Sequence, residues 1–471
     1  MLIRDDVFIG GKWVPAGGGR RDIVNPATEE VVARVRDGAA ADARHAVEAA
    51  REAFESWSST PLGQRLAVLR RALAIFGKRG EELARTVTAE VGTPITAART
   101  TSVGGAERLL AETVDIAGGY TFETRDGPSL IRREPVGVVA AISPWNQPLY
   151  LAMVKIAPAL AAGCTVVHKP GESSPLSAYL LTEILDAAGV PAGVFNMVPG
   201  TGAEVGEVLD THPAVDMVDF TGSTAAGRRV AELAALTLKR LVLELGGKSA
   251  AVLLDDADLE HAVSESVHSC LNNAGQMCGA WTRMLVPRNR IDEATDLAVA
   301  AVAQYRQGDP ADESTTLGPL ANAAQYDRVR DYIRAGLRED ATLVTGGLDR
   351  PPTLDRGYYV RPTVFTHVRN DMRIAREEIF GPVLSLIPHD GDDDAVALAN
   401  DSDYGLRGAV FSADPDRALA VARRLRTGQV DINAYKMNPR APFGGFKQSG
   451  LGRCQGIPGF EEFLELKAIQ L

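Results

Sequence analysis

Cysteine is scarce in this sequence, and its scarcity excludes one means of stabilising a chain. The 471 residues contain only Cys164, Cys270, Cys278 and Cys454, with no paired spacing among them. Disulfide frameworks belong to small secreted domains with closely spaced cysteines. We therefore expect four free thiols in a reducing compartment, one of which is available for chemistry.

Long apolar runs and an excess of basic charge are also missing. No apolar stretch approaches the roughly 18 residues that a membrane-spanning helix needs, and the first residues lack the cationic and apolar segments of a signal peptide. Acidic residues outnumber basic ones, 61 to 50, which gives a formal net charge of -11. Because nucleic-acid binding normally requires a basic face, we expect a cytoplasmic protein that binds neither a membrane nor nucleic acid.

Histidine is sparse as well. Of the seven histidines, His261 and His268 alone share a predicted helix, and neither has a cysteine or carboxylate at the spacing of a metal site. The sequence predicts no metal.

What is present is the composition of a folded protein with several domains. Hydrophobic residues make up 45% and charged residues 24%, close to the averages for folded proteins. At roughly 100–200 residues per domain, the length predicts two to four domains. Helical spacing of apolar residues predicts a run of helices through residues 39–118.

From residue 136 onward, strand-like and helical stretches alternate. This alternation predicts an α/β fold with two parallel sheets built by right-handed crossovers and joined near residues 246–248. Residues 129–135 and 461–471 alternate polar and apolar side chains outside either sheet, and both are candidates for arms that pair with another subunit. The strand-like runs fall at 136–143, 164–169, 194–198, 215–220 and 240–245 for the first sheet, and at 250–254, 282–287, 408–412 and 429–433 for the second.

The stretch NNAGQMCG at 272–279 places a cysteine in a loop after a predicted helix. Gly275 and Gly279 on either side leave the sulfur of Cys278 accessible to a ligand, as a nucleophile requires. Cys164 and Cys270 instead fall on apolar strand and helix patterns that are typical of buried thiols. The sequence therefore predicts Cys278 as the reactive thiol.

Two other polar side chains lie at the end of a predicted strand or in the loop directly after one. Glu244 in LELGGK (243–248) lies where α/β active sites form, and it fits either a general base or an exposed carboxylate. Asn146 in SPWN (143–146) fits either a hydrogen-bond donor to an oxyanion or an ordinary helix cap.

Two motifs suggest a nucleotide site. In FTGSTAAG (220–227), Gly222 and Gly227 lie at a strand-to-helix junction, where a helix amino terminus can approach a pyrophosphate. In HKPGE (168–172), Lys169 and Glu172 can face a ribose, although a solvated ion pair fits equally well. Neither motif is the GxGxxG fingerprint, so spacing alone leaves the dinucleotide assignment open.

Taken in order, these segments, with EEIFGPV (377–383) and APFGGFKQSGLGR (441–453), resemble the aldehyde dehydrogenase superfamily over residues 8–471. The resemblance implies oxidation of an aldehyde to a carboxylic acid with NAD(P)+. It implies that Cys278 forms a thiohemiacetal and then a thioester, that Glu244 is the general base for hydrolysis, and that Asn146 and the Cys278 amide bind the oxyanion.

The resemblance also implies a cofactor site that prefers NAD to NADP, because the charge of Glu172 would repel the extra phosphate. Lys169 and Glu172 would contact the adenosine ribose, and Ser223 with the following helix the pyrophosphate. The implied cofactor residues are Ile142, Ser143, Pro144, Trp145, Lys169, Glu172, Gly202, Phe220, Thr221, Gly222, Ser223, Gly227, Leu245, Gly246 and, at the nicotinamide ribose, Glu378 and Phe380.

The family fold further implies how the chain is divided. It implies a discontinuous NAD(P)-binding domain (1–118 and 138–248), a catalytic domain (249–445), and an oligomerisation arm that pairs with the tail (119–137 and 446–471). Such proteins are homodimers or homotetramers.

Departures from the family pattern concern mainly the substrate side. Gln147 stands where an aromatic residue is frequent, Met277 flanks the nucleophile, and Cys454 replaces a common Glu. Gln147, Met277 and Phe443 are the candidate substrate contacts, and the sequence does not determine the aldehyde.

Two alternatives remain. A coenzyme-A-acylating semialdehyde dehydrogenase shares the fold and the nucleophile, but the presence of Glu244 disfavours it. A non-catalytic binding or structural relative would be expected to lack the nucleophile or the base, and both are present.

Overall fold

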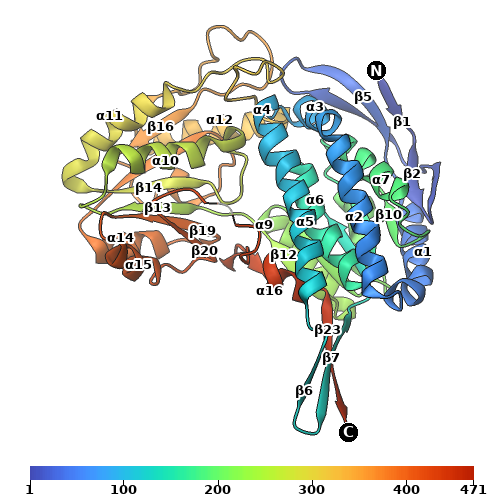
Figure 1. Cartoon of the computed structure of the whole chain (residues 1–471). Helices are drawn as coiled ribbons and strands as arrows, with labels where there is room; N and C mark the ends of the chain where they lie inside the picture. Colours follow the sequence, from blue (N-terminus) through green and yellow to red (C-terminus); the bar gives the residue numbers. More distant parts are fainter. Residues whose placement is uncertain (437) are drawn as a thin grey trace.

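The computed structural model describes residues 1–436 and 438–471, and the chain forms two α/β lobes with a projecting arm (Figure 1). Each lobe has a large twisted sheet covered by helices. The chain passes from the first sheet to the second between Glu244 and Ser249, where the sequence predicts the join.

The sheet of the first lobe has the strand order β22-β12-β11-β8-β9-β10-β2-β3. The strands from β12 to β10 are parallel, as crossover helices require. Strands β22, β2 and β3 join the two edges antiparallel, so the sheet is mixed and not parallel throughout. The strands are Asp6–Ile9 (β2), Lys12–Pro15 (β3), Val138–Ile142 (β8), Thr165–Lys169 (β9), Phe195–Met197 (β10), Met217–Thr221 (β11), Arg240–Glu244 (β12) and Gly450–Leu451 (β22).

The direction of winding reverses at β8, because β9 lies on one side of it and β11 on the other. The loops that follow β8 and β11 therefore diverge at the carboxyl edge of the sheet. Such a switch point opens a crevice in which α/β proteins bind ligands.

Helices cover both faces of this sheet, and successive strand residues are buried on alternate faces. Ala140 and Val218 lie in a core with α1 and α9, whereas Ala141 and Met217 lie in a larger core with α5 and α6. The helices predicted for 39–118 are present as α1 to α5. The helices of this lobe are Ala40–Ser58 (α1), Leu62–Lys78 (α2), Gly80–Val91 (α3), Ile95–Ala97 (α4), Gly104–Gly119 (α5), Pro148–Ala162 (α6), Leu176–Ala187 (α7), Glu207–Thr211 (α8), Thr224–Ala234 (α9) and Gly456–Glu461 (α16), with short π or 3-10 turns at Ala98–Val103, Gly202–Gly206 and Ala235–Thr237.

The second lobe has the strand order β15-β16-β17-β14-β13-β19-β20, parallel except for β15. The sequence analysis did not predict the strands β15 to β17. The strands are Ser249–Leu253 (β13), Trp281–Pro287 (β14), Thr342–Thr345 (β15), Thr363–Thr366 (β16), Val383–His389 (β17), Arg407–Phe411 (β19) and Gln429–Ile432 (β20), with a small ladder of Tyr404–Gly405 (β18) and Phe446–Lys447 (β21). The helices are Leu259–Leu271 (α10), Ile291–Val302 (α11), Ala323–Arg338 (α12), Arg373–Arg376 (α13), Asp392–Asn400 (α14) and Pro415–Ala422 (α15), with 3-10 turns at Asn272–Gly275 and Arg288–Arg290.

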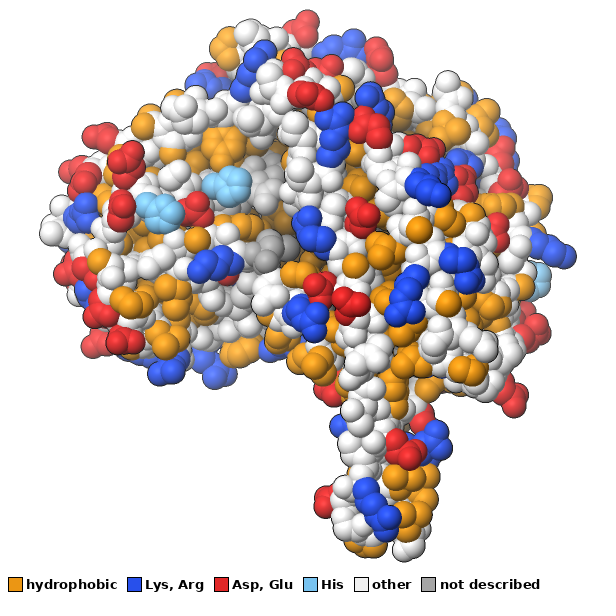
Figure 2. All heavy atoms as spheres, in the orientation of Figure 1, with side chains coloured by type: hydrophobic (Ala, Val, Ile, Leu, Met, Phe, Trp, Pro, Cys, Tyr) orange, Lys and Arg blue, Asp and Glu red, His pale blue; other side chains and the backbone are white. Residues whose placement is uncertain are grey.

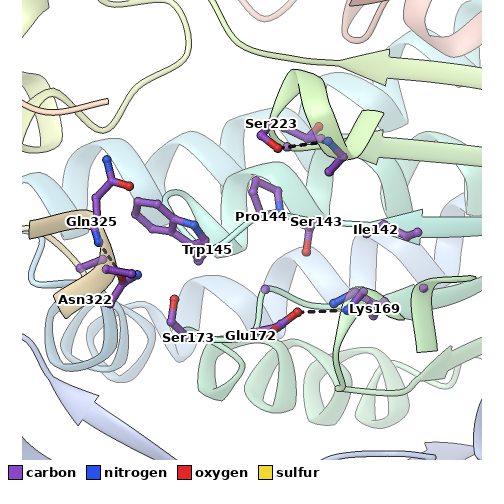
Figure 3. A pocket seen from close by; sticks show the side chains of 18 of the residues that line it. Ile142, Ser143, Pro144, Trp145, Lys169, Glu172, Ser173, Ser223, Asn322 and Gln325 are labelled. Carbon is purple, nitrogen blue, oxygen red and sulfur yellow. Dashed lines mark hydrogen bonds between the residues drawn. The ribbon is translucent and has the colours of Figure 1, made fainter. Parts of the chain in front are cut away.

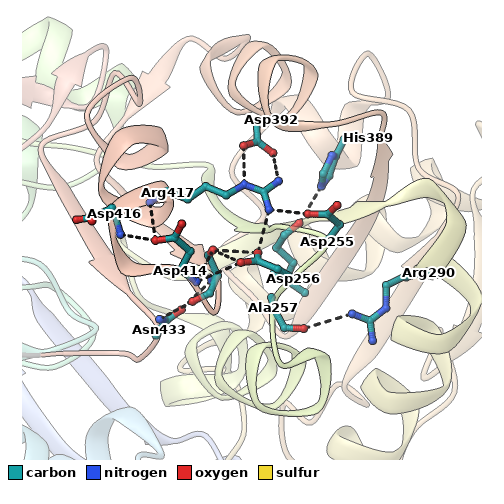
Figure 4. A network of polar contacts seen from close by, with 12 residues as sticks. Asp255, Asp256, Ala257, Arg290, His389, Asp392, Asp414, Asp416, Arg417 and Asn433 are labelled. Carbon is teal, nitrogen blue, oxygen red and sulfur yellow. Dashed lines mark hydrogen bonds and ion pairs between the residues drawn. The ribbon is translucent and has the colours of Figure 1, made fainter.

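A polar network around Arg417 ties together three segments of this lobe (Figure 4). The guanidinium donates to both carboxylate oxygens of Asp392, at 2.9 and 2.6 Å, and to Asp255 at 2.7 Å. Because Asp255 follows β13 and Asp392 begins α14, the network fixes the loops at the carboxyl ends of the strands of the second sheet.

The arm is an antiparallel sheet of Glu123–Asp126 (β6), Ser129–Pro135 (β7) and Leu464–Gln470 (β23). Strand β23 pairs with β7 along its whole length, so the two stretches that the sequence suggested as arms for another subunit pair with each other. The side chains of Leu466 and Leu471 are each 68% exposed, and hydrophobic side chains gather along one side of the arm in Figure 2.

Two further segments differ from the sequence interpretation. Residues 446–463, which were grouped with the tail, contribute β22 to the first sheet and Phe460 to its core. The amino-terminal residues also form a small sheet of Leu2–Arg4 (β1), Glu30–Arg36 (β5) and Arg20–Asn25 (β4), which the sequence analysis did not predict. Among the described residues, no helix combines the length and the apolar character needed to cross a bilayer.

Candidate active site

The loops after β8, β9 and β11 meet at the switch point of the first sheet. Figure 3 shows Ser143, Pro144 and Trp145 between Ser223 on one side and Lys169 with Glu172 on the other, with Gln325 of α12 nearby. These loops and α12 line a cavity of about 970 Å³. That volume is near the upper end of the ~300–1,000 Å³ typical of cofactor and ligand pockets.

One end of this outer cavity carries Lys169 and Glu172. The Lys169 ammonium donates to the carbonyls of Pro170 and Gly200, at 3.0 and 2.8 Å, and burial lowers the pKa of this lysine to about 8. The Glu172 carboxylate accepts from the Gly202 amide at 3.0 Å. A cation and a carboxylate fixed side by side offer both a donor and acceptors to a sugar.

The amino terminus of α9 opens into the same cavity. The hydroxyl of Ser223 accepts from the Ala226 amide at 3.2 Å and caps the helix. A β-carbon on Gly222 would lie 2.5 Å from the ring of Phe220, so only glycine leaves this approach clear. Free amides and the helix dipole make such a terminus suited to an anionic group.

A smaller cavity of about 200 Å³ adjoins the outer one and shares Trp145 and Ser223 with it. Cys278, Glu244 and Asn146 all line this inner cavity, as do Glu378 and Phe380. The three residues that the sequence singled out for chemistry therefore come together, although they lie in three different segments of the chain.

The loop that carries Cys278 is wound in an uncommon conformation. Asn273, Ala274 and Gly275 have φ angles of 50°, 56° and 76°, all in the left-handed region. A β-carbon on Gly275 would lie 2.2 Å from the backbone of Gly381, so the turn is also closely packed. Strained turns of this kind persist where surrounding contacts fix them, and here the turn leaves Cys278 partly exposed in the cavity.

Glu244 ends β12 and is 3% exposed. Within the described residues, neither of its carboxylate oxygens has a hydrogen-bond partner. Burial raises the pKa of Glu244 to about 8, and the nearby Cys278 thiol and the Lys155 charge only partly oppose this. The carboxylate is thus poised to take a proton near neutral pH.

Burial and the negative charge of Glu244 raise the pKa of the Cys278 thiol well above its usual value. Two such groups resist simultaneous ionisation, because like charges repel strongly in a buried site. Ionisation of the thiol is therefore coupled to protonation of Glu244.

The remaining polar groups are held in place around this pair. The Asn146 amide donates one hydrogen to the Gln276 carbonyl at 2.8 Å, which leaves its second hydrogen available. The Glu378 carboxylate accepts from the Gly247 amide at 3.0 Å, and Trp145 packs edge-on against Phe380 with ring centroids 5.5 Å apart.

The structure brings most of the sequence-predicted residues to these two cavities, but four lie elsewhere. Gly227 packs α9 against the sheet, since a β-carbon there would lie 2.4 Å from Leu245. The side chain of Gln147 is buried and accepts from the Ser102 hydroxyl at 3.0 Å. Met277 and Phe443 are absent from the lining of both cavities as described. The predicted residues that line them are Ile142, Ser143, Pro144, Trp145, Asn146, Lys169, Glu172, Gly202, Phe220, Thr221, Gly222, Ser223, Glu244, Leu245, Gly246, Cys278, Glu378 and Phe380.

Sequence reasoning missed several lining residues. Arg21 of β4 reaches the outer cavity from the amino-terminal sheet, and Gln325 and Arg328 reach it from α12 of the other lobe. No local motif marks these positions, because each comes from a segment distant in the sequence. Among the described residues, no group of three or more metal-ligating side chains is arranged around a common point.

Comparisons with known proteins agree with this geometry. Residues 13–469 match the sequence profile described as the aldehyde dehydrogenase family. The chain is 48% identical over 467 residues to the 3-succinoylsemialdehyde-pyridine dehydrogenase of a Pseudomonas species, covering 98% of each protein. It is 46% identical over 473 residues to the geranial dehydrogenase of Castellaniella defragrans, covering 99% of this chain and 98% of that protein.

Solved structures are similar over the whole fold. A variant of aldehyde dehydrogenase C from Pseudomonas syringae, in complex with NAD+ and octanal, superposes with a TM-score of 0.98 at 49% identity, covering 99% of this chain and 96% of that one. An aldehyde dehydrogenase of Mycobacterium tuberculosis in complex with NAD+ has a TM-score of 0.97 at 44% identity, covering 100% and 98%.

Proposed function

The chain belongs to the aldehyde dehydrogenase family and is an NAD(P)-dependent oxidoreductase, and we propose that it converts an aldehyde to a carboxylic acid through a thioester on Cys278. The observation that carries this proposal is the convergence of Cys278, Glu244 and Asn146 on one inner cavity. That cavity opens into a larger one whose donors suit a dinucleotide.

The donor set of the outer cavity fits a nicotinamide dinucleotide. The α9 terminus with Ser223 suits a pyrophosphate, Lys169 and Glu172 suit the adenosine ribose, and Glu378 with Phe380 suits the nicotinamide ribose. When bound, the nicotinamide supplies a hydride acceptor. The protein contributes orientation and the exclusion of water.

The first half of the reaction uses Cys278. Its sulfur attacks the aldehyde carbon, and Glu244 is placed to accept the thiol proton, since the two groups share one inner cavity and ionise in a coupled way. The oxyanion is held by the free amide hydrogen of Asn146 and by the Cys278 backbone amide. Loss of hydride from this thiohemiacetal leaves a thioester on Cys278.

The second half uses Glu244 as the base that activates water. Glu244 first releases the thiol proton to solvent and is a carboxylate again. Water then attacks the thioester carbon, Glu244 takes one of the water protons, and the carbon–sulfur bond breaks to release the carboxylic acid and the Cys278 thiolate. A buried carboxylate whose pKa is raised to about 8 supports this role. Its presence beside Cys278 disfavours coenzyme A as the acyl acceptor and also disfavours a non-catalytic relative of the same fold.

We propose NAD as the preferred cofactor, because Glu172 places a carboxylate beside the expected 2′ position of the adenosine ribose.

We also propose that residues 1–118 and 138–248 bind this cofactor, that 249–445 carry the nucleophile, and that the arm (119–137 with the tail) assembles a homodimer or homotetramer. The exposed apolar side of the arm supports the assembly proposal.

A panel of aldehydes tests the function. Octanal, geranial, a pyridine-bearing semialdehyde and a carboxylate-bearing aldehyde are each mixed with enzyme and NAD, and NADH is followed by absorbance. We expect acid and NADH in equal amounts, loss of both in Cys278→Ala, and retention in Cys270→Ala, since Cys270 is buried at 0% exposure. Turnover that persists in Cys278→Ala would remove the thioester assignment.

A further inference from the structure

Arg21 forms an ion pair with Glu172 at the adenosine end of the outer cavity. The Arg21 Nη1 atom lies 2.9 Å from a carboxylate oxygen of Glu172, and Arg21 itself lines the cavity. The contact joins β4 of the amino-terminal sheet to the loop after β9, 151 residues apart in the chain. A cation thus lies beside the charge that should repel a 2′-phosphate and partly offsets it.

The guanidinium is anchored independently of Glu172. Its Nε donates to Asp37 at 3.1 Å, and its Nη2 also donates to Asp37, which is only 14% exposed. A guanidinium has a rigid planar fork, so two bonds to Asp37 fix the direction of the third nitrogen. Nη1 therefore keeps its position even when Glu172 moves.

Glu172 is the more exposed partner. Its side chain is 45% exposed, and besides Arg21 it is held by the Gly202 amide at 3.0 Å. Burial opposes its ionisation, but Arg21 and Lys169 outweigh burial and hold the pKa of Glu172 below its usual value. It is thus a carboxylate at neutral pH that can turn toward solvent.

We propose that Arg21 is a cofactor-specificity residue that lets this site accept NADP as well as NAD, by exchanging its Nη1 contact with Glu172 for an oxygen of the 2′-phosphate. The inference rests on the proposed cofactor site and deepens it. With NAD, Glu172 stays paired and accepts from the ribose hydroxyls. With NADP, Glu172 turns outward, and Arg21 and Lys169 face the phosphate together.

The exchange gives Arg21 and Glu172 opposite effects on one ratio, the affinity for NADP divided by that for NAD. Arg21→Ala should lower the ratio by about ten- to a hundredfold, which is the equivalent of one charge-assisted hydrogen bond. Glu172→Gln should raise the ratio, because it removes the repulsion and frees Nη1. In the Arg21→Ala background the rise caused by Glu172→Gln should be smaller, since only the loss of repulsion remains and the Arg21 contact with the phosphate is absent.

Titration calorimetry of NAD and NADP, without aldehyde, measures the ratio independently of Cys278 and Glu244. Arg20→Ala is the matched control, because Arg20 is the neighbouring arginine on β4, pairs with Asp5 at 2.7 Å and does not line the cavity. We expect Arg20→Ala to bind both cofactors as the wild type does. Melting temperatures of the free variants report whether each one folds.

Equal weakening of both cofactors in Arg21→Ala, or a rise caused by Glu172→Gln that is just as large in the Arg21→Ala background, would overturn the proposal. If Arg21→Ala does not fold, Arg21→Lys takes its place and should lower the ratio less, because it keeps the charge but loses the fork that anchors it to Asp37. Failure of the wild type to bind either dinucleotide would contradict the proposed function instead.

Discussion

Lys155 and Asp219 form an ion pair of 2.5 Å beneath the inner cavity, with side chains 1% and 2% exposed. Lys155 comes from α6 and Asp219 from β11. Thr221 pairs with Glu244 in the neighbouring strand, and Asp219 precedes Thr221 by two residues, so Asp219 and Glu244 point to the same face of the sheet. The buried pair is therefore both a structural element of the first lobe and part of the electrostatic surroundings of Glu244.

Breaking this pair should destabilise the protein. Asp219→Ala leaves the Lys155 ammonium buried without its counter-charge, a change that typically costs about 3–5 kcal/mol. We expect a clearly lower melting temperature in this variant. The double variant Lys155→Met and Asp219→Leu should recover most of the loss, because it leaves no unpaired charge. A single variant that melts like the wild type would show that the pair contributes little.

The same pair should shift the pH dependence of turnover. Glu244 accepts a proton only when ionised, so with a pKa of about 8 in the free enzyme, the rate of thioester hydrolysis should fall as the pH drops below about 8. Lys155 lowers the pKa of Glu244 and Asp219 raises it. The fall in rate at low pH, the acid limb of the pH profile, should thus move to higher pH in Lys155→Met and to lower pH in Asp219→Asn.

Single-turnover decay of the acyl-enzyme across a pH series measures this limb. Lys467→Met removes a positive charge from the distant arm, where Lys467 pairs with Glu134, and should leave the limb in place. A wild-type rate that stays constant down to pH values where an ordinary carboxylate, with a pKa of about 4.5, begins to protonate would contradict the assignment.

The arm provides a test of assembly. Deleting residues 466–471 removes most of β23 but keeps Phe463 and Leu464, which are buried in the core of the first lobe. The deletion uncovers the edge of β7 and removes the exposed Leu466 and Leu471. We expect a smaller species by light scattering, with the far-UV spectrum unchanged. Elution and mass identical to the full-length protein would remove the arm from the proposed interface.

The fold could be predicted from the sequence where hydrophobic periodicity is strong. The strands β8, β9 and β11 are buried on both faces, so their residues are mostly apolar in succession, a pattern that predicts a buried strand. The amino-terminal strands could not be predicted in this way. β4, for example, is half charged and partly exposed, and it owes its strand conformation to pairing with β5 and not to its own pattern.

The residues of the site likewise differ in whether the sequence alone could predict them. Cys278, Glu244 and Asn146 each carry a local signal, since Glu244 lies at the end of a predicted strand and the other two lie in loops directly after a predicted element. Arg21 and Asp219 carry none, because their partners Glu172 and Lys155 are contacts made by the fold across many residues.

Two departures from the family pattern have contacts that only the structure shows. Gln147, a candidate substrate contact, accepts a hydrogen bond from the Ser102 hydroxyl. Cys454 is buried, and its backbone exchanges 2.7 Å hydrogen bonds with Phe443 in both directions.

The two halves of the proposed reaction can be separated at Glu244. Replacing it with Gln keeps its size and buried position but removes the ability to accept a proton. A positioned general base typically contributes about 10²–10⁴-fold, so hydrolysis of the thioester should slow by that order. The variant should still attack aldehyde and reduce about one cofactor per site. It should then stall with the acyl group on Cys278, because a covalent mechanism allows one turnover before hydrolysis is needed.

The burst itself reports the second role of Glu244. Loss of the carboxylate removes the proposed proton acceptor for the thiol, although it also removes the negative charge that raises the pKa of Cys278. We therefore expect a slower burst than in the wild type. A burst as fast as in the wild type would mean that the thiol loses its proton to another acceptor. Rapid mixing with excess aldehyde and NAD, followed by intact-mass analysis, reads both the burst and the trapped acyl group. Steady turnover of Glu244→Gln at the wild-type rate would show that Glu244 is not the base. A thiol such as coenzyme A would then have to be tested as the acyl acceptor.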